Sequence, residues 1–218
     1  MSKDYYPPEA DRDCLLCPRL VEFRRENQQK FPDFFNGAVP SYGPAGGDTA
    51  VEFLIIGLAP GLKGANWSGR PFTGDYAGDL LYDVLLEAGL ASGTYDRHPD
   101  DGMELRKTMI TNAVRCVPPQ NKPIGAEINT CRPFLVSRIE SLKNLKVMMC
   151  LGKISHDSTI KTLGLKLKDY PFGHGAIHSL PDGKTLIDSY HCSRYNVNTN
   201  RLTRDMFMDV VKTCRTYL

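Results

Sequence analysis

The sequence predicts an α/β fold built around a parallel sheet of four strands. Four short, mainly apolar runs recur along the chain, and the first, at residues 53–56, is continuous, which is typical of a strand that is buried on both faces. Between these runs, apolar residues recur at the three- and four-residue spacing of helices. Strands that alternate with helices in this way indicate parallel pairing through right-handed crossovers.

The predicted strands and helices follow one another in a regular order. The strands are expected at residues 53–56, 109–114, 147–151 and 186–190, with a weaker fifth strand at residues 175–180. The helices between them are expected around residues 80–90, 134–142 and 154–163. A last helix carries an apolar stripe, formed by Leu202, Met206, Val210, Cys214 and Leu218. Ligands bind at the carboxyl ends of the strands in folds of this kind, so the loops after the strands are the first place to look for a site.

Composition indicates one domain of ordinary globular character. The chain has 218 residues, of which 41% are hydrophobic and 24% are charged, and its formal net charge is +2. A charge this small does not by itself indicate a polyanionic partner. The apolar runs are far shorter than a membrane span, and residues 1–6 contain no apolar signal region. We therefore expect a cytoplasmic protein with no membrane partner, folded as a single domain over residues 1–218 with residues 1–47 as an N-terminal extension.

Four of the seven cysteines form a candidate metal site. Cys14 and Cys17 are separated by two residues in a polar segment before the first strand, and Cys116 and Cys131 form a wider pair. Four thiolates bind either zinc or a [4Fe–4S] cluster, and the wide second pair favours the cluster. Zinc and two unrelated pairs remain the alternatives. The other cysteines are Cys150 and Cys214, which are expected in the core, and Cys192. The sequence does not decide whether Cys192 lies in the core or outside it.

Short motifs along most of the chain resemble those of the iron–sulfur uracil-DNA glycosylases, most closely family 5, also called type b. The resemblance extends from Cys14 to the C-terminus and includes the four cysteines of the candidate metal site. Each motif is short, but their order, spacing and combination are specific. In chain order the motifs are Gly57-Leu58-Ala59-Pro60-Gly61, Gly69-Arg70-Pro71-Phe72-Thr73-Gly74-Asp75, Thr111-Asn112 and His191-Cys192-Ser193-Arg194-Tyr195-Asn196.

The resemblance implies a three-layer α/β/α sandwich and a [4Fe–4S] cluster on Cys14, Cys17, Cys116 and Cys131. It also implies a DNA repair enzyme that flips a deaminated base out of DNA and hydrolyses its N-glycosidic bond. We expect a monomeric, monofunctional glycosylase without lyase activity, associated with the nucleoid if the cell is prokaryotic. We expect it to act on uracil and also on hypoxanthine or xanthine. Two alternatives remain open on the same fold, an iron–sulfur redox or sensor protein and a non-catalytic binder of damaged DNA.

Three segments supply candidate contacts to the base. Phe72 is expected to stack on the flipped ring, and the turn that contains Gly57 and Ala59 is expected to line the pocket. Asn112 ends the second strand, and its amide can pair with the edge of uracil, so it is a candidate for both binding and catalysis. Because an amide can rotate, Asn112 discriminates uracil from cytosine only if its neighbours fix its orientation. The alternative for Phe72 and Asn112 is a purely structural role.

Asp75 and His191 are the candidate catalytic residues beside the sugar and the departing base. His191 ends the fourth strand, where its imidazole can donate to uracil O2 as negative charge develops there. The turn at residues 57–61 contains no carboxylate, so Asp75 is expected to orient water or to stabilise the cationic sugar. Asp75 also precedes a predicted helix, where an aspartate is a common N-cap. The two roles do not exclude each other.

The loop after His191 is polar and basic, which indicates contacts with DNA. The candidate DNA-binding residues are Ser193, Arg194, Tyr195 and Arg201, and they include an aromatic side chain that can fill the gap left by the base. Other basic residues are expected to contact phosphates at the same edge of the sheet or at the start of the last helix, and these are Lys63, Arg70, Lys153 and Arg204.

Overall fold

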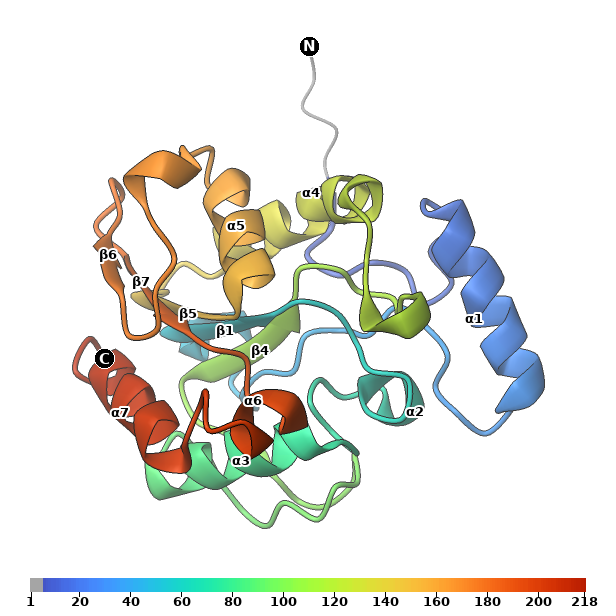
Figure 1. The fold of residues 1–218 in the computed structure, drawn as a ribbon, viewed down its shortest axis with the longest axis horizontal. Helices are drawn as coiled ribbons and strands as arrows, with labels where there is room; N and C mark the ends of the chain where they lie inside the picture. Colours follow the sequence, from blue (N-terminus) through green and yellow to red (C-terminus); the bar gives the residue numbers. More distant parts are fainter. Residues whose placement is uncertain (1–5) are drawn as a thin grey trace.

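A sheet of five strands forms the centre of this computed structural model, which describes residues 6–218 (Figure 1). The four parallel strands confirm the four that the sequence predicts. The weaker predicted strand is also present, and it pairs antiparallel with its neighbour at one edge. In spatial order the strands are β4 (Thr108–Asn112), β1 (Phe53–Gly57), β5 (Val147–Leu151), β7 (Thr185–Ser189) and β6 (Ile177–Ser179).

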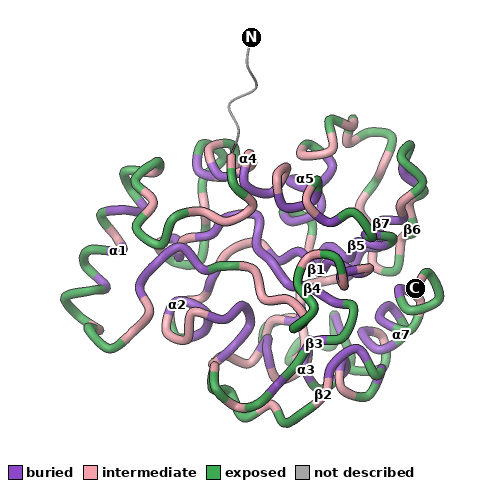
Figure 2. Tube along the Cα trace, turned by 180° about the vertical axis from the view of Figure 1, so that it is seen from behind, coloured by how far each residue is buried: buried purple, intermediate pink, exposed green. Residues whose placement is uncertain are grey.

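Helices cover both faces of the sheet, which confirms the three-layer α/β/α sandwich. One face is covered by α3 (Tyr76–Glu87) and α7 (Arg204–Arg215), and the other by α4 (Gly125–Ser141) and α5 (Lys153–Thr162) (Figure 1). Every residue of the four parallel strands is buried, and Figure 2 shows these buried segments inside a more exposed outer layer. The strands β1 and β5 are accordingly apolar throughout, whereas β4 and β7 also bury polar residues.

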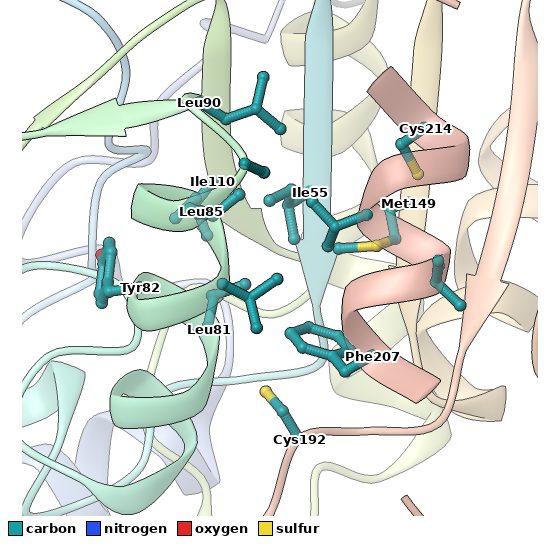
Figure 3. Packing of buried hydrophobic residues seen from close by; sticks show 14 of the residues in the cluster. Ile55, Leu81, Tyr82, Leu85, Leu90, Ile110, Met149, Cys192, Phe207 and Cys214 are labelled. Atoms are coloured by element: carbon teal, nitrogen blue, oxygen red, sulfur yellow. The ribbon is translucent and has the colours of Figure 1, made fainter. Parts of the chain in front are cut away.

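The larger core lies between the sheet and the helices α3 and α7. Figure 3 shows Leu81 and Leu85 of α3 on one side of Ile55 in β1, with Phe207 of α7 on the other. Cys192, for which the sequence left two readings, is buried in this core. The core thus anchors the chain at the residue that follows His191.

Two helices, α3 and α4, begin earlier than their apolar spacing predicts, because a carboxylate binds backbone N–H groups at the start of each. The carboxylate of Asp75 accepts hydrogen bonds from the backbone N–H groups of Ala77 and Gly78, at 3.1 and 3.3 Å, so α3 begins at Tyr76. In α4, the carboxylate of Glu127 accepts from the N–H of Ile124 at 2.8 Å. The helical register therefore begins at a cap, several residues ahead of the first apolar stripe.

The apolar pattern does not predict α1 (Pro18–Lys30), which lies in the N-terminal extension. This helix buries Arg24 and Asn27 as well as apolar residues, so its buried face has no apolar stripe. Residues 1–5 of the extension lie outside the described part of the chain. None of the helices in residues 6–218 is long and apolar enough to cross a membrane. The remaining short elements are α2 (Ala65–Ser68), α6 (Arg194–Asn198), the paired strands β2 (Ala91–Ser92) and β3 (Glu104–Leu105), and 3-10 turns at Asp48–Ala50, Pro119–Asn121 and Leu167–Asp169.

The strand order places the carboxyl ends of β1 and β4 next to each other. The chain leaves β1 towards β4 on one side, whereas β5 and β7 are added on the other side of β1. Parallel α/β sheets bind ligands outside the carboxyl ends of their strands where the winding reverses in this way. The loops after β1, β4 and β7 therefore surround one candidate site.

A buried histidine and aspartate join α5 to β7. Nδ1 of His156 lies 2.7 Å from Oδ1 of Asp188, and Nε2 lies 2.9 Å from the carbonyl oxygen of Tyr170, which can only accept. Nε2 of His178 lies 3.1 Å from the second carboxyl oxygen of Asp188. Burial alone would lower the pKa of His156, but the hydrogen bond and charge of Asp188 outweigh it and raise the pKa above its usual value. We infer that His156 is an imidazolium within a buried ion pair.

The substitution His156→Phe should lower the free energy of unfolding by about 3 kcal/mol at pH 6, because it leaves the buried Asp188 without its cationic partner. The folded-state pKa of His156 is raised, so its contribution is complete below about pH 6.5 and is lost as the pH rises through the folded-state pKa. Urea unfolding from pH 6 to pH 9 measures both effects, with His98→Gln as the control. A difference between wild type and His156→Phe that is independent of pH would contradict the ion pair.

Candidate active site

A cleft of about 620 Å³ lies at the carboxyl edge of the sheet. It is lined by Phe72, Asp75, Asn112 and His191, the four side chains on which the sequence-based hypothesis depends. They come from the loop before α3, the cap of α3, the end of β4 and the segment after β7. Its volume is in the usual range for sites that bind small molecules. Residues that are far apart in the sequence therefore meet around one space.

Asn112 presents a buried acceptor that has no partner in the protein. Its residue is 3% exposed, and Oδ1 makes no hydrogen bond within residues 6–218. Gly57 is the residue paired with Asn112 in the parallel register, and a Cβ atom at Gly57 would lie 2.3 Å from Oδ1. Leaving a buried acceptor unpaired costs about 1–3 kcal/mol, so the site favours a ligand that donates a hydrogen bond here. Only glycine at position 57 allows this close approach.

Phe72 is held in a backbone conformation that is unusual for its residue type. Its φ angle is 55°, in the left-handed region, which costs about 1–3 kcal/mol for such residues and occurs mainly where surrounding contacts enforce it. Its ring lies close to Gly57, where a Cβ atom would be 2.8 Å from Cζ. The ring centroid is 6.0 Å from that of His191, with the planes inclined by 31°. The aromatic face and the imidazole thus border the same space.

Asp75 is both a helix cap and a cleft residue. One carboxyl oxygen caps α3, and the other lies against the loop after β1, where a Cβ atom at Gly64 would be 2.2 Å from Oδ2 and one at Gly61 would be 2.9 Å away. Burial raises the pKa of Asp75, although the hydrogen bonds from Gly78 and Ala77 oppose the rise. The carboxylate is therefore fixed in place and more basic than an exposed aspartate.

His191 has a neutral imidazole at physiological pH. Burial lowers the pKa of its imidazole to about 4, since no carboxylate stabilises the charged form. Its carbonyl oxygen accepts a hydrogen bond of 2.8 Å from the side-chain amide of Asn196, which fixes the backbone after β7. The imidazole therefore lines the cleft on a firmly held segment.

The four predicted DNA-binding residues occupy different positions around the cleft. Ser193 and Arg194 line it, with Ser193 capping α6 and the guanidinium of Arg194 lying 5.2 Å from the ring centroid of Tyr76. Tyr195 follows Arg194 on α6, is 71% exposed and does not line the cleft. Arg201 does not line the cleft, and its guanidinium lies over the ring of Tyr190.

Several lining residues were not predicted from the sequence. Asn121 reaches the cleft from a 3-10 turn five residues after Cys116, and both it and Gln120 have left-handed φ angles, of 56° and 55°. Asp79 and Arg97 pair at the edge of the cleft with an N–O distance of 2.6 Å. The sequence feature that could have indicated this turn is its pair of consecutive polar residues, Gln120 and Asn121.

Comparison with known proteins identifies the family. The model of the uracil DNA glycosylase superfamily matches residues 44–215. The chain belongs to the uracil DNA glycosylase superfamily. A Type-5 uracil-DNA glycosylase of Thermus thermophilus is 41% identical over 203 residues, which cover 91% of this chain and 90% of that protein.

Two proteins of Pyrobaculum aerophilum distinguish the branches of the superfamily. Its Type-5 uracil-DNA glycosylase is 33% identical over 92% of this chain and 87% of its own length. Its Type-4 uracil-DNA glycosylase has the same identity over only 72% of this chain and 64% of its own length. The predicted resemblance to family 5 is confirmed.

In this superfamily member, the four cysteines of the predicted metal site converge behind the turn that follows β1. Cys14 and Cys17 precede α1, Cys116 follows β4, and Cys131 lies in α4, and all four line one small cavity. Ala59 packs against this group and also lines the cleft. The turn after β1 is thus a wall shared by the cleft and the cysteine group.

Two buried guanidinium groups lie beside the cysteines. Arg115 is 1% exposed and lines the cavity, and its backbone N–H lies 3.4 Å from Sγ of Cys131. Arg24 donates to the carbonyl oxygen of Cys14 at 3.1 Å. Burial, and then the nearby sulfur atoms of Cys131 and Cys14, raise the pKa of Cys17 to about 11. Four thiolates are therefore stable here only with compensating positive charge.

The expected phosphate contacts of Arg70 and Arg204 are wrong, because both side chains are already paired. Arg70 is buried and forms two hydrogen bonds of 2.8 Å with Asp101. Arg204 bridges Asp83 and Glu87 on α3 instead of forming an anion site. Of the other two basic residues, Lys63 is exposed and lines the cleft, while Lys153 pairs with Asp157. The predicted burial of the two core cysteines, Cys150 and Cys214, is confirmed.

The imidazole of His191 should titrate with a midpoint near pH 4, because burial disfavours its charged form. Histidine NMR spectra of the ¹⁵N-labelled protein recorded from pH 3.5 to pH 8 measure this midpoint, and His191→Gln identifies the resonance by its loss. A midpoint for His191 near pH 6.5 would contradict the neutral imidazole assigned to the cleft.

Proposed function

We propose that this chain is a DNA glycosylase that removes uracil from DNA by hydrolysing its N-glycosidic bond. The observation that carries the proposal is the convergence of an aromatic ring, an amide, a neutral imidazole and a carboxylate on one cleft of this fold. The relatives described above bear the name uracil-DNA glycosylase. Each group in the cleft meets one chemical requirement of base excision.

Uracil satisfies the buried amide of Asn112. A flipped uracil stacks on the ring of Phe72, and its N3–H donates to Oδ1, the acceptor that lacks a partner within residues 6–218. Cytosine has an acceptor at N3, so it would set one lone pair against another and leave both groups unpaired. This preference for uracil applies to the amide orientation of the structure, in which Oδ1 points into the space beside Gly57.

His191 stabilises the base as it departs. Cleavage of the glycosidic bond places negative charge on the uracil ring, and the imidazole N–H donates to O2, where part of that charge develops. Since the pKa of His191 is about 4, the imidazole is neutral and acts as a hydrogen-bond donor without transferring a proton. Its ring borders the same space as Phe72, so both act on one base.

Asp75 acts on the sugar side of the bond. Its capping contacts with α3 fix the carboxylate, and its burial raises the pKa. A carboxylate held in this way orients the attacking water and stabilises the positive charge that develops on the sugar. Lys63 is the one lysine that lines the cleft within residues 6–218, and it lies outside the matched motifs. We therefore propose hydrolysis by water and a monofunctional enzyme.

The turn after β1 favours a broad range of bases. Leu58, Ala59 and Pro60 line the cleft without contributing a side-chain oxygen. This wall neither repels nor selects the polar edge of a purine, so hypoxanthine and xanthine are proposed as further substrates. At the mouth of the cleft, Arg194 and Tyr195 are proposed to contact the DNA backbone and to fill the gap left by the flipped nucleotide.

We also propose that Cys14, Cys17, Cys116 and Cys131 hold a [4Fe–4S] cluster. All four cysteines line one small cavity. The wide sequence spacing of Cys116 and Cys131 favours a cluster, in which each cysteine binds a separate iron, over a zinc ion. When bound, the cluster would cross-link the N-terminal extension, the loop after β4 and α4.

The decisive experiment measures single-turnover release of uracil, hypoxanthine and xanthine from labelled duplexes by the wild-type protein and by Asp75→Asn. We expect the wild type to release all three and the variant to be slower by about 100-fold or more, because it lacks the carboxylate at the sugar. Asparagine is also a good N-cap, so the stability of α3 is retained.

The control for the cap is Asp75→Ala, which should lose a further ~1 kcal/mol of unfolding free energy in urea. Wild-type protein that binds the duplex but releases no base would identify a non-catalytic binder and refute the enzyme. Release of uracil alone would refute the broad specificity. Normal rates in Asp75→Asn would leave Asp75 only its capping role.

The substitution Cys17→Ser should remove the absorption near 400 nm that is typical of a [4Fe–4S] protein and should lower its thermal stability. The matched control is Cys214→Ser, which alters a core cysteine outside the cavity and should retain the absorption. Iron analysis and ultraviolet–visible spectra measure the result. Full iron content in Cys17→Ser would contradict the proposed ligand set.

A further inference from the structure

A buried ion pair outside the cleft holds the loop that carries Phe72. Arg70 and Asp101 form two hydrogen bonds of 2.8 Å, and neither side chain lines the cleft. The guanidinium of Arg70 also donates to Oγ1 of Thr73 at 2.7 Å and to the carbonyl oxygen of Pro99 at 3.1 Å. The pair therefore ties the Phe72 loop to the segment that contains Asp101.

Asp101 also organises its own segment. Its carboxylate accepts hydrogen bonds from the backbone N–H groups of Asp96 and Met103, at 2.9 and 3.0 Å. Burial alone would raise the pKa of Asp101, but these bonds and those from Arg70 outweigh it and lower the pKa to about 2. The carboxylate thus stays ionised and keeps all of its partners at physiological pH.

Two tyrosines connect this support to the backbone beside the base. The hydroxyl of Tyr95 donates to the carbonyl oxygen of Phe72 at 3.1 Å, and that of Tyr82 donates to the carbonyl oxygen of Pro71 at 2.7 Å. The two phenol rings lie 4.5 Å apart between centroids, and the guanidinium of Arg70 lies over both. The ion pair, the phenols and the loop therefore form one packed unit.

Phe72 depends on this unit because its left-handed backbone is not self-supporting. A phenylalanine with free carbonyl groups on either side favours negative φ, which would turn its ring away from the cleft. From the other side, α3 closes on the same carbonyl, where a Cβ atom at Gly78 would lie 1.8 Å from the oxygen. The carbonyl of Phe72 is thus fixed between a tyrosine hydroxyl and a helix that has room for it only at a glycine.

We propose that Tyr95, Arg70 and Asp101 are positioning residues that hold the ring of Phe72 in the plane where it stacks on the base. The inference rests on the proposed glycosylase function. It states that residues that do not touch the base help to orient the ring that does. Small displacements of a stacking group alter the reaction rate strongly, because the glycosidic bond must be aligned with the groups that act on it. Bases of different size should respond differently to such a displacement.

The test is Tyr95→Phe, which removes the hydroxyl and keeps the ring beside Tyr82. We expect single-turnover release of uracil to fall about tenfold and the ratio of uracil to hypoxanthine release to change by about threefold or more. In a Phe72→Leu background the same substitution should change the rate by less than about twofold, since the ring to be positioned is absent. The control is Tyr217→Phe, at a partly exposed residue that does not line the cleft.

A second measurement does not depend on catalysis. NMR spectra of protein with labelled phenylalanine and histidine should show proximity between the rings of Phe72 and His191 in the wild type and in Tyr217→Phe. The signal should weaken in Tyr95→Phe and in Asp101→Asn. Thermal unfolding identifies any variant whose loss of rate reflects loss of folded protein.

Equal effects of Tyr95→Phe in the two backgrounds, or an unchanged ring contact, would overturn the positioning role. A loss of rate that only parallels the loss of folded protein would do the same. A different result would refute the glycosylase function and keep the positioning role. In that case the wild-type protein releases no base, but the contact between the two rings still weakens in Tyr95→Phe and in Asp101→Asn. The two failures are therefore distinguishable.

Discussion

The close approach of β1 and β4 at their carboxyl ends is the constraint on which the site depends. Gly57 and Asn112 are paired in the parallel register, and the missing side chain at Gly57 lets the amide oxygen and the ring of Phe72 occupy the space beside it. Without that space neither the unpaired acceptor nor the aromatic face would border the cleft. Sheet register, a property of the backbone, thus determines which groups border the cleft.

Much of the fold could be predicted because it follows from burial. The strands β1 and β5 are continuous apolar runs because both of their faces are covered, and β4 and β7 keep shorter apolar runs beside buried polar residues. The helix α1 could not be predicted in this way, because Arg24 and Asn27 occupy its buried face, and Arg24 hydrogen-bonds to the backbone at Asp13 and Cys14 instead of packing in an apolar core. Polar burial has no periodic signature in the sequence.

The side chains of the cleft could be predicted from motifs, whereas their partners could not. Phe72, Asp75, Asn112 and His191 all line one cleft, as the motifs implied. Arg70 belongs to the same motif but is buried against Asp101, and Arg204 is bound to carboxylates of α3. Such pairings join residues distant in the sequence, so local composition only shows that a basic residue is present. Whether it is free to meet a phosphate depends on the tertiary structure.

The cleft is built from segments that are far apart in the sequence, so it is complete only after the last of them has been synthesised. Its lining begins with the turn after β1, and it is completed by His191 and Arg194, which follow β7. A nascent chain released or cleaved before residue 185 lacks the parallel strand β7 and the imidazole of His191 that follows it. No partial function is expected of such a fragment, because the cleft lacks His191 and Arg194 until β7 and the segment after it have been synthesised.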